Sequence, residues 1–132
     1  MIPRTLIALC LAFTALQVSA DDIAGIWKHA DEPGWIEITL EDGRGTGTVL
    51  RNDKFPERVG RKILKGLQPA GEGEWHGQVY AERMGEYRDV KVLLAAPDSM
   101  HFKVKVGFIT RTLEWVRSDA ASAAAGPDNA DP

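Results

Sequence analysis

Residues 99–117 read SMHFKVKVGFITRTLEWVR and contain two alternating runs separated by Gly107. A repeat of two is the period of a strand with one buried face, because successive side chains of a strand point to opposite sides of the sheet. The side chains expected to share a face are Met100, Phe102, Val104 and Val106 in the first run, and Ile109, Arg111, Leu113, Trp115 and Arg117 in the second. Two long consecutive strands need further strands beside them, since a sheet edge leaves backbone groups unpaired.

Earlier segments of the chain are expected to supply those strands. Turn signals such as Asp42-Gly43 divide residues 26–95 into short extended runs. The expected strands are 26–28, 35–40, 44–51, 62–67, 74–82 and 86–95, with one helical turn as the alternative for 62–67 and a loop at 68–73. About eight strands joined by short turns favour an all-β fold with antiparallel up-and-down pairing. Closure into a small β-barrel then removes the exposed edges.

The first twenty residues have the features of an export signal. Arg4 supplies a positive charge, residues 6–16 are almost entirely apolar, and Val18-Ser19-Ala20 ends the segment with a small-x-small cleavage pattern. We expect cleavage after Ala20, a mature domain at residues 21–117, and a periplasmic or secreted location. The apolar run is shorter than the ~20 residues that a spanning helix needs, so we expect no transmembrane segment in the mature chain. Cleavage would also remove Cys10, the only cysteine.

The tail, residues 118–132, consists of small and polar residues without a large apolar side chain. Such a segment buries too little surface to offset the entropy lost on ordering, and we expect it to be disordered. The whole chain carries a net charge of −3, which does not favour a nucleic-acid partner. The sequence does not specify an oligomeric state.

No arrangement of residues typical of a catalytic site is visible in the sequence, so we expect a binding protein rather than an enzyme, with no cofactor and no bound metal. His29 with Asp31 and Glu32 is the alternative that favours a metal site, but a solvated turn explains the same residues. Glu72 and Glu74 with His76 are the alternative for acid–base chemistry, but an exposed loop and strand face explain these residues.

Two groups of residues are candidates for binding. Three aromatic side chains, Trp75, Tyr80 and Tyr87, are expected to line a ligand cavity, with core packing as the alternative. The local excess of positive charge at residues 51–65 is a candidate patch for an anionic partner, with an ordinary solvated loop as the alternative. Its basic residues are Arg51, Lys54, Arg58, Arg61, Lys62 and Lys65.

Five short motifs follow one another along the domain: GIW at 25–27, DG at 42–43 followed by Gly47, RKILKGL at 61–67, WHGQVY at 75–80 and LEWVR at 113–117. In this order and spacing they resemble the DUF2147 family, which comprises small exported bacterial proteins with a lipocalin-like β-barrel. The resemblance extends over residues 22–117. It implies that the barrel is lipocalin-like.

The lipocalin-like comparison implies a structural role for Gly25, Trp27 and Arg117. In lipocalins a Gly-x-Trp on the first strand lies at the closed end of the barrel, and an arginine near the last strand covers its indole. We therefore expect a cation–π contact between Arg117 and Trp27 that closes the barrel. Arg111, on the same strand face as Arg117, is the rival partner.

Two functional hypotheses follow from the resemblance and the aromatic residues. The first is an exported, non-enzymatic protein that binds a small hydrophobic or amphipathic molecule in the mouth of the barrel. The second is a protein-interaction module of the cell envelope. In the second hypothesis the barrel is filled with side chains, and residues 51–65 or an outer sheet face contact the partner.

Overall fold

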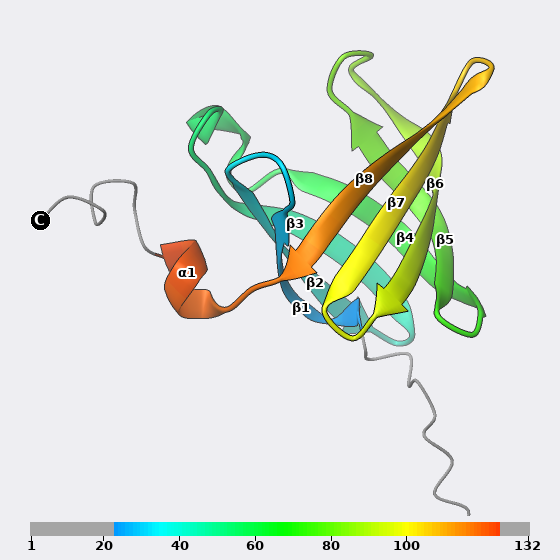
Figure 1. The fold of residues 1–132 in the computed structure, drawn as a ribbon. Helices are drawn as coiled ribbons and strands as arrows, with labels where there is room; N and C mark the ends of the chain where they lie inside the picture. The colour runs from blue at the N-terminus through cyan, green and yellow to red at the C-terminus, as the bar shows by residue number, and fades with distance from the viewer. Residues whose placement is uncertain (1–22, 125–132) are drawn as a thin grey trace, which may run out of the picture.

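The computed structural model describes residues 23–124, and within them eight strands pair antiparallel in the order of the chain. The strands are β1 (Gly25–His29), β2 (Gly34–Glu41), β3 (Arg44–Asn52), β4 (Lys62–Gly71), β5 (Glu74–Ala81), β6 (Glu86–Ala96), β7 (Ser99–Val106) and β8 (Ile109–Arg117). β8 also pairs with β1, so the sheet closes on itself (Figure 1). The prediction of an all-β, up-and-down barrel is confirmed. The predicted signal peptide, residues 1–20, lies outside the described residues.

The alternation along each strand determines which side chains fill the barrel. In β7, Met100, Phe102 and Val104 are buried, whereas the alternate residues Lys103 and Lys105 are exposed. The same period places one apolar residue from nearly every strand inside. The largest fully buried side chains are Trp27, Phe102, Ile23, Ile36, Ile38, Leu64, Leu67, Met100 and Val92. These side chains form one core, because the inner faces of all strands point toward a common axis.

Glycines allow β3, β4 and β5 to approach one another closely. A Cβ atom on Gly47 would lie 2.9 Å from the Cβ of Leu64, and one on Gly77 would lie 2.8 Å from the carbonyl oxygen of Lys65. Real Cβ atoms do not approach neighbours so closely, so larger residues there would push the strands apart. The glycines therefore explain why Leu64 and Leu67 of β4 reach full burial.

The structure differs from the sequence-based prediction in the segment after residue 67. Residues 62–67 form a strand, not a helical turn, and the strand continues to Gly71 where a loop was expected. Gln68 pairs with His76 and Pro69 with Trp75, and the register shifts on both sides of this short ladder. A proline lacks a backbone N–H, and such irregularities in pairing are where a strand tolerates it. The Pro- and Gly-rich residues after 67 therefore belong to a bulged strand and not to a loop.

The beginning of the tail also differs from its prediction. Ala120–Ala124 form one short helix, α1, although disorder was expected from residue 118 onward. The Asp119 carboxylate accepts a hydrogen bond from the backbone N–H of Ser122 at 2.7 Å, and the Arg51 side chain donates to the Ser122 carbonyl oxygen at 3.0 Å. Capping and alanine's high helix propensity explain the local order without an apolar core. Residues 125–132 lie outside the described part.

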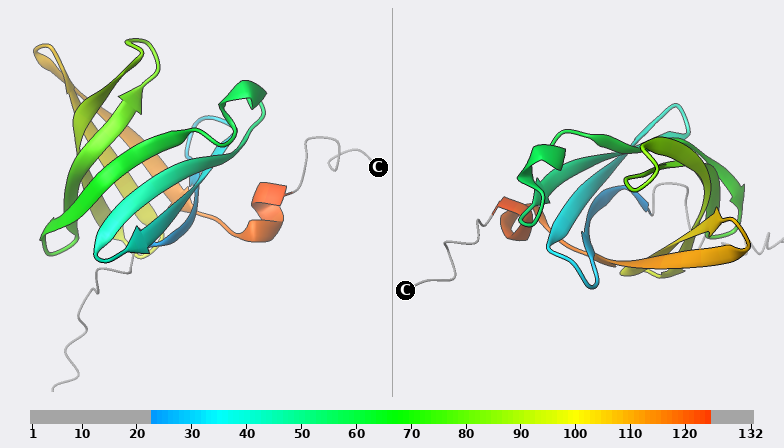
Figure 2. Two further views of the ribbon diagram at one scale, coloured as in Figure 1. Left: turned by 180° about the vertical axis from the view of Figure 1, so that it is seen from behind. Right: turned by 90° about the horizontal axis from the view of Figure 1, so that it is seen from above.

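The up-and-down topology gives the barrel two unlike ends, which are seen from two further directions in Figure 2. One end carries the connections after β1, β3, β5 and β7, including the 3-10 helix η2 (Pro56–Arg58). We call it the cavity end. The other carries the connections after β2, β4 and β6, together with the start of β1, and we call it the Trp27 end. The residues described in the next subsection lie at one or the other of these two ends.

Candidate functional site

At the Trp27 end, the structure brings together the three residues expected to close the barrel. The Trp27 indole is fully buried and its N–H donates to the carbonyl oxygen of Ile23 at 3.0 Å. The Arg117 guanidinium carbon lies 4.1 Å from the centre of the Trp27 ring. Gly25 has a φ of +131°, and a Cβ there would lie 3.1 Å from Arg117 Nη1. A larger residue at 25 would therefore crowd the guanidinium.

Arg117 is held over the indole by the backbone around it. Its Nη1 donates to the Ala24 carbonyl oxygen at 2.9 Å, and its Nη2 donates to the Pro97 carbonyl oxygen at 2.9 Å. Three chain segments thus converge on one guanidinium. Arg111, the rival partner, lies at the opposite end of β8, where Val104 is its neighbour on β7. The Arg117 guanidinium is thus fixed over the Trp27 indole at this end of the barrel.

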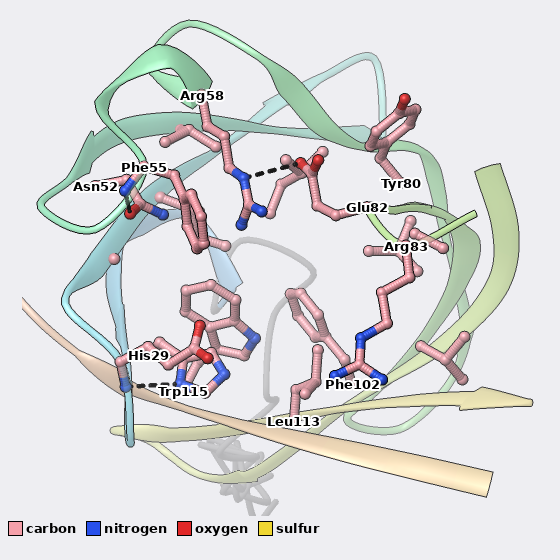
Figure 3. A pocket seen from close by; sticks show the side chains of 18 of the residues that line it. His29, Asn52, Phe55, Arg58, Tyr80, Glu82, Arg83, Phe102, Leu113 and Trp115 are labelled. Atoms are coloured by element: carbon pink, nitrogen blue, oxygen red, sulfur yellow. Dashed lines mark hydrogen bonds and ion pairs between the residues drawn. The ribbon is translucent and has the colours of Figure 1, made fainter. Parts of the chain in front are cut away.

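The cavity end contains a cavity of about 560 Å³, within the range of pockets that bind small molecules. Its apolar walls are Ile36, Val49, Ile63, Val79, Phe102, Val104, Val106, Leu113 and Trp115. The side chains of the described residues therefore leave open space at this end. Figure 3 shows the cavity with Phe102, Leu113 and Trp115 on one side of it.

Aromatic contacts fix the wall beneath the cavity. The Trp115 ring lies 5.3 Å from that of Phe102 and 5.0 Å from that of His29, the latter edge to face. His29 itself is oriented by its Nδ1, which accepts the backbone N–H groups of Asp31 and Glu32 at 3.1 Å. Trp115 is 6% exposed, and its indole N–H has no hydrogen-bond partner among the described residues. The indole N–H groups of Trp35 and Trp75 are buried without a partner in the same way.

Charged residues surround the cavity where its wall reaches solvent. On the η2 side, Arg58 stacks on Phe55 at 3.8 Å, and its Nε lies 3.7 Å from a Glu82 oxygen. Arg61 also hydrogen-bonds to Glu82, and this contact raises the pKa of the Arg61 guanidinium above its ordinary value. Arg83 follows in the β5–β6 connection, and Figure 3 shows it extending toward the cavity. Glu82 thus neutralises part of the positive charge here.

The three aromatic residues expected to line a ligand cavity do not share one. Of Trp75, Tyr80 and Tyr87, only Tyr80 borders the cavity. Trp75 is buried in the core, and Tyr80 packs edge to face against Tyr87 at 5.3 Å. The Tyr87 hydroxyl donates to the Lys62 carbonyl oxygen at 2.7 Å. The reason is the period of two: Trp75 and Val79 face inward, whereas Tyr80 and its cross-strand neighbour Tyr87 lie on the outer face. Tyr80 borders the cavity only at its edge, as Figure 3 shows.

The basic residues of 51–65 are divided among different partners. Arg51 lies over the Trp35 ring at 4.2 Å and binds both carboxylate oxygens of Asp53. The Lys65 ammonium lies 3.8 Å from the centre of the Tyr87 ring. Lys54 and Arg58 border the cavity, and Arg61 binds Glu82. The backbone carbonyl of Lys62 accepts the hydrogen bond from Tyr87.

The histidine alternatives have their own local explanations. His76 lies on the exposed face of β5, with Nε2 2.7 Å from a Glu74 carboxylate oxygen. Within residues 23–124, no group of three His, Cys, Asp or Glu side chains is placed to hold a metal ion. The same residues include no helix that is long and apolar enough to cross a membrane.

Sequence reasoning did not select Phe102, Leu113, Trp115 or Arg83 as site residues. The first three lie on the inner faces of β7 and β8, and the alternation of residues 99–117 carried that signal. Arg83 had no comparable signal, because a turn residue reaches the cavity only once the barrel is closed.

Comparisons with known proteins agree with the geometry. Residues 25–117 match the model of DUF2147, described as an uncharacterized protein conserved in bacteria. A solved Helicobacter pylori protein, described as belonging to the lipocalin family, is similar with a TM-score of 0.58 and 18% sequence identity, over 75% of this chain and 84% of that chain. A redesigned β-barrel is similar with a TM-score of 0.48 and 13% identity, over 76% of this chain and 94% of that chain. No curated protein matches the sequence.

Proposed function

Because the chain belongs to the DUF2147 family and folds as a lipocalin-like barrel, we propose that it is an exported, non-enzymatic binding protein for a small hydrophobic or amphipathic molecule. The observation that carries the proposal is the cavity of about 560 Å³ with largely apolar walls. The transfer of an apolar molecule into such a cavity is favourable by roughly 25 cal/mol for each Å² of its apolar surface that is removed from water. Export is supported by the features of residues 1–20.

The arrangement of the barrel supports binding at one end only. The seal formed by Trp27 and Arg117 closes the opposite end, so a molecule in the cavity would enter and leave past the charged residues at the cavity end. The strand pairs around the cavity provide a rigid frame, because backbone hydrogen bonds hold its walls. A preformed pocket limits the entropy lost on binding.

Filling the cavity tests the proposal. Leu113 is half-buried in the cavity wall, whereas Val116 of the same strand is 39% exposed and does not line the cavity. We expect Leu113→Trp to abolish binding of a neutral fluorescent probe, N-phenyl-1-naphthylamine, and the matched control Val116→Trp to retain it. Circular dichroism of both variants checks that each has folded.

Native mass spectrometry of the protein purified from the periplasm provides a second readout. We expect a bound molecule that is absent from Leu113→Trp, and an N-terminus at Asp21. A wild-type protein that carries no molecule and takes up no probe would contradict the binding function. An uncleaved protein in the cytoplasm would contradict export alone.

A further inference from the structure

Two arginines at the cavity end have no partner among the described residues. Arg83 and Arg111 both line the cavity, and neither makes a hydrogen bond, an ion pair or a cation–π contact within residues 23–124. The other two cations of the lining have such contacts: Arg58 with Glu82 and Phe55, and Lys54 with Phe55. Arg83 and Arg111 therefore hold charge and donors that the protein itself does not use.

The position of the two arginines relates them to the apolar walls. Arg111 lies on β8, opposite Val104 of β7. It comes two residues before Leu113 and shares the inner face with it. Arg83 comes from the β5–β6 connection, and in Figure 3 its guanidinium points toward the side of the cavity that holds Phe102. Both side chains thus lie where the apolar cavity meets solvent. A molecule with its apolar part inside would place a polar head group near them.

The chemistry of arginine selects the charge of that head group. A guanidinium presents several N–H donors in a plane and pairs in a bidentate manner with a carboxylate or a phosphate. The carboxylates that line the cavity without a cationic partner, Asp31 and Glu32, follow His29, which lies across the cavity from Arg83 in Figure 3. An anionic group is therefore attracted to the Arg83 side and repelled from the Asp31 side.

We propose that the ligand is an amphiphile with one anionic head group, a carboxylate or a phosphate, which Arg83 and Arg111 bind while its hydrocarbon part contacts Phe102, Leu113 and Trp115. The inference rests on the proposed binding function. It adds the class of ligand and the two residues that distinguish that class from neutral molecules.

Three probes with the same twelve-carbon chain separate the head group from the tail: dodecanoate, dodecyl phosphate and dodecanol. Each is titrated against the protein loaded with N-phenyl-1-naphthylamine, and displacement gives its dissociation constant. We expect at least one of the anions to bind about a hundredfold more tightly than dodecanol, because each of the two arginines is expected to contribute about tenfold. The better anion identifies the head group as carboxylate or phosphate.

The variants Arg83→Gln and Arg111→Gln test the assigned residues. Each is expected to weaken binding of the preferred anion about tenfold and to leave dodecanol binding unchanged. Arg44→Gln is the matched control, because Arg44 is exposed at the start of β3, at the Trp27 end. It is expected to change neither. All three arginines are exposed, so the variants should keep the wild-type melting temperature, which is measured alongside.

The two proposals fail in different ways. If dodecanol binds as tightly as both anions, or if Arg44→Gln weakens anion binding as much as the other variants do, the head-group assignment is overturned and the apolar site stands. If none of the three probes displaces N-phenyl-1-naphthylamine at millimolar concentration and the wild type does not bind it, both proposals fail.

Discussion

The Trp27 end and the cavity end are built from the same strands, but they use aromatic and arginine residues differently. At the Trp27 end, the indole and the guanidinium contact each other, and their polar atoms bond to backbone carbonyl groups. At the cavity end, Arg83 and Arg111 have no partner among the described residues. The arginine of the first end is paired within the chain, whereas the two arginines of the second hold N–H donors that the described residues do not use. The difference teaches that the same residue types stabilise the fold at one end and, in the proposed function, serve binding at the other.

The largest expected effect is that of Trp27→Ala, because it removes a fully buried side chain and exposes the Ile23 carbonyl to a cavity. We expect a loss of about 3–5 kcal/mol in the free energy of unfolding, measured by urea denaturation. Leu113→Ala, at the cavity end, should lose only about 1–2 kcal/mol, because its side chain already borders open space. Equal losses at both ends would remove the distinction between a sealed end and a binding end.

A smaller effect on the free energy of unfolding is expected from substituting the arginines of β8. Arg117→Gln should lower the free energy of unfolding by about 1–2 kcal/mol, because it removes the cation–π contact and hydrogen bonds to Ala24 and Pro97. Arg111→Gln, on the same face of β8, should be within about 0.5 kcal/mol of the wild type. Thermal unfolding of the two variants side by side measures this difference, and the reverse order would make Arg111 the closing residue.

The smallest effect concerns the helix α1, which is held by two carboxylates. The Arg51 guanidinium lowers the pKa of Asp53, and the Ser122 backbone N–H lowers the pKa of Asp119. A carboxyl group with a lowered folded pKa stabilises the folded form above its ordinary pKa of about 4 and loses that contribution as the pH falls through the folded value. We therefore expect α1 to detach below about pH 4 while the barrel stays folded.

An NMR titration follows this detachment through the amide signals of residues 120–124, with those of Val92 and Phe102 as the barrel reference. Asp119→Asn should shift the transition, because asparagine caps a helix without titrating. If the α1 and barrel signals change together, α1 is not an independent unit and the carboxylates act on the whole fold.

Much of the fold could be predicted from the alternation of residues, since a period of two fixes both the strands and their inner faces. The same period could have corrected the site: Trp75 and Tyr80 are five positions apart and must face opposite sides of β5. The segment after residue 67 was predicted wrongly because Pro69 and Gly71 are loop formers that a bulged pairing with β5 accommodates. The residue types of this segment alone do not show that it pairs with β5.

The cavity itself was beyond prediction from the sequence, because its volume depends on how far the inner side chains of opposite strands reach. Val79 and Phe102 both line the cavity, although they come from β5 and β7, which are not neighbours in the sheet. Arg83 is a similar case: nothing in a turn sequence states that its guanidinium extends over an opening formed by other strands. Only closure of the barrel brings these groups together.

The short ladder between β1 and β8 has a consequence for how the chain folds. It comprises three residue pairs, fewer than any strand pair made by sequence neighbours except the irregular ladder of β3 and β4. It joins segments as far apart as Ala24 and Arg117, 93 positions along the chain. The entropy lost in joining distant segments makes such contacts slow to form. We therefore expect the hairpins to assemble first and the barrel to close last, so that a nascent chain still lacking β8 would expose the inner face that later lines the cavity.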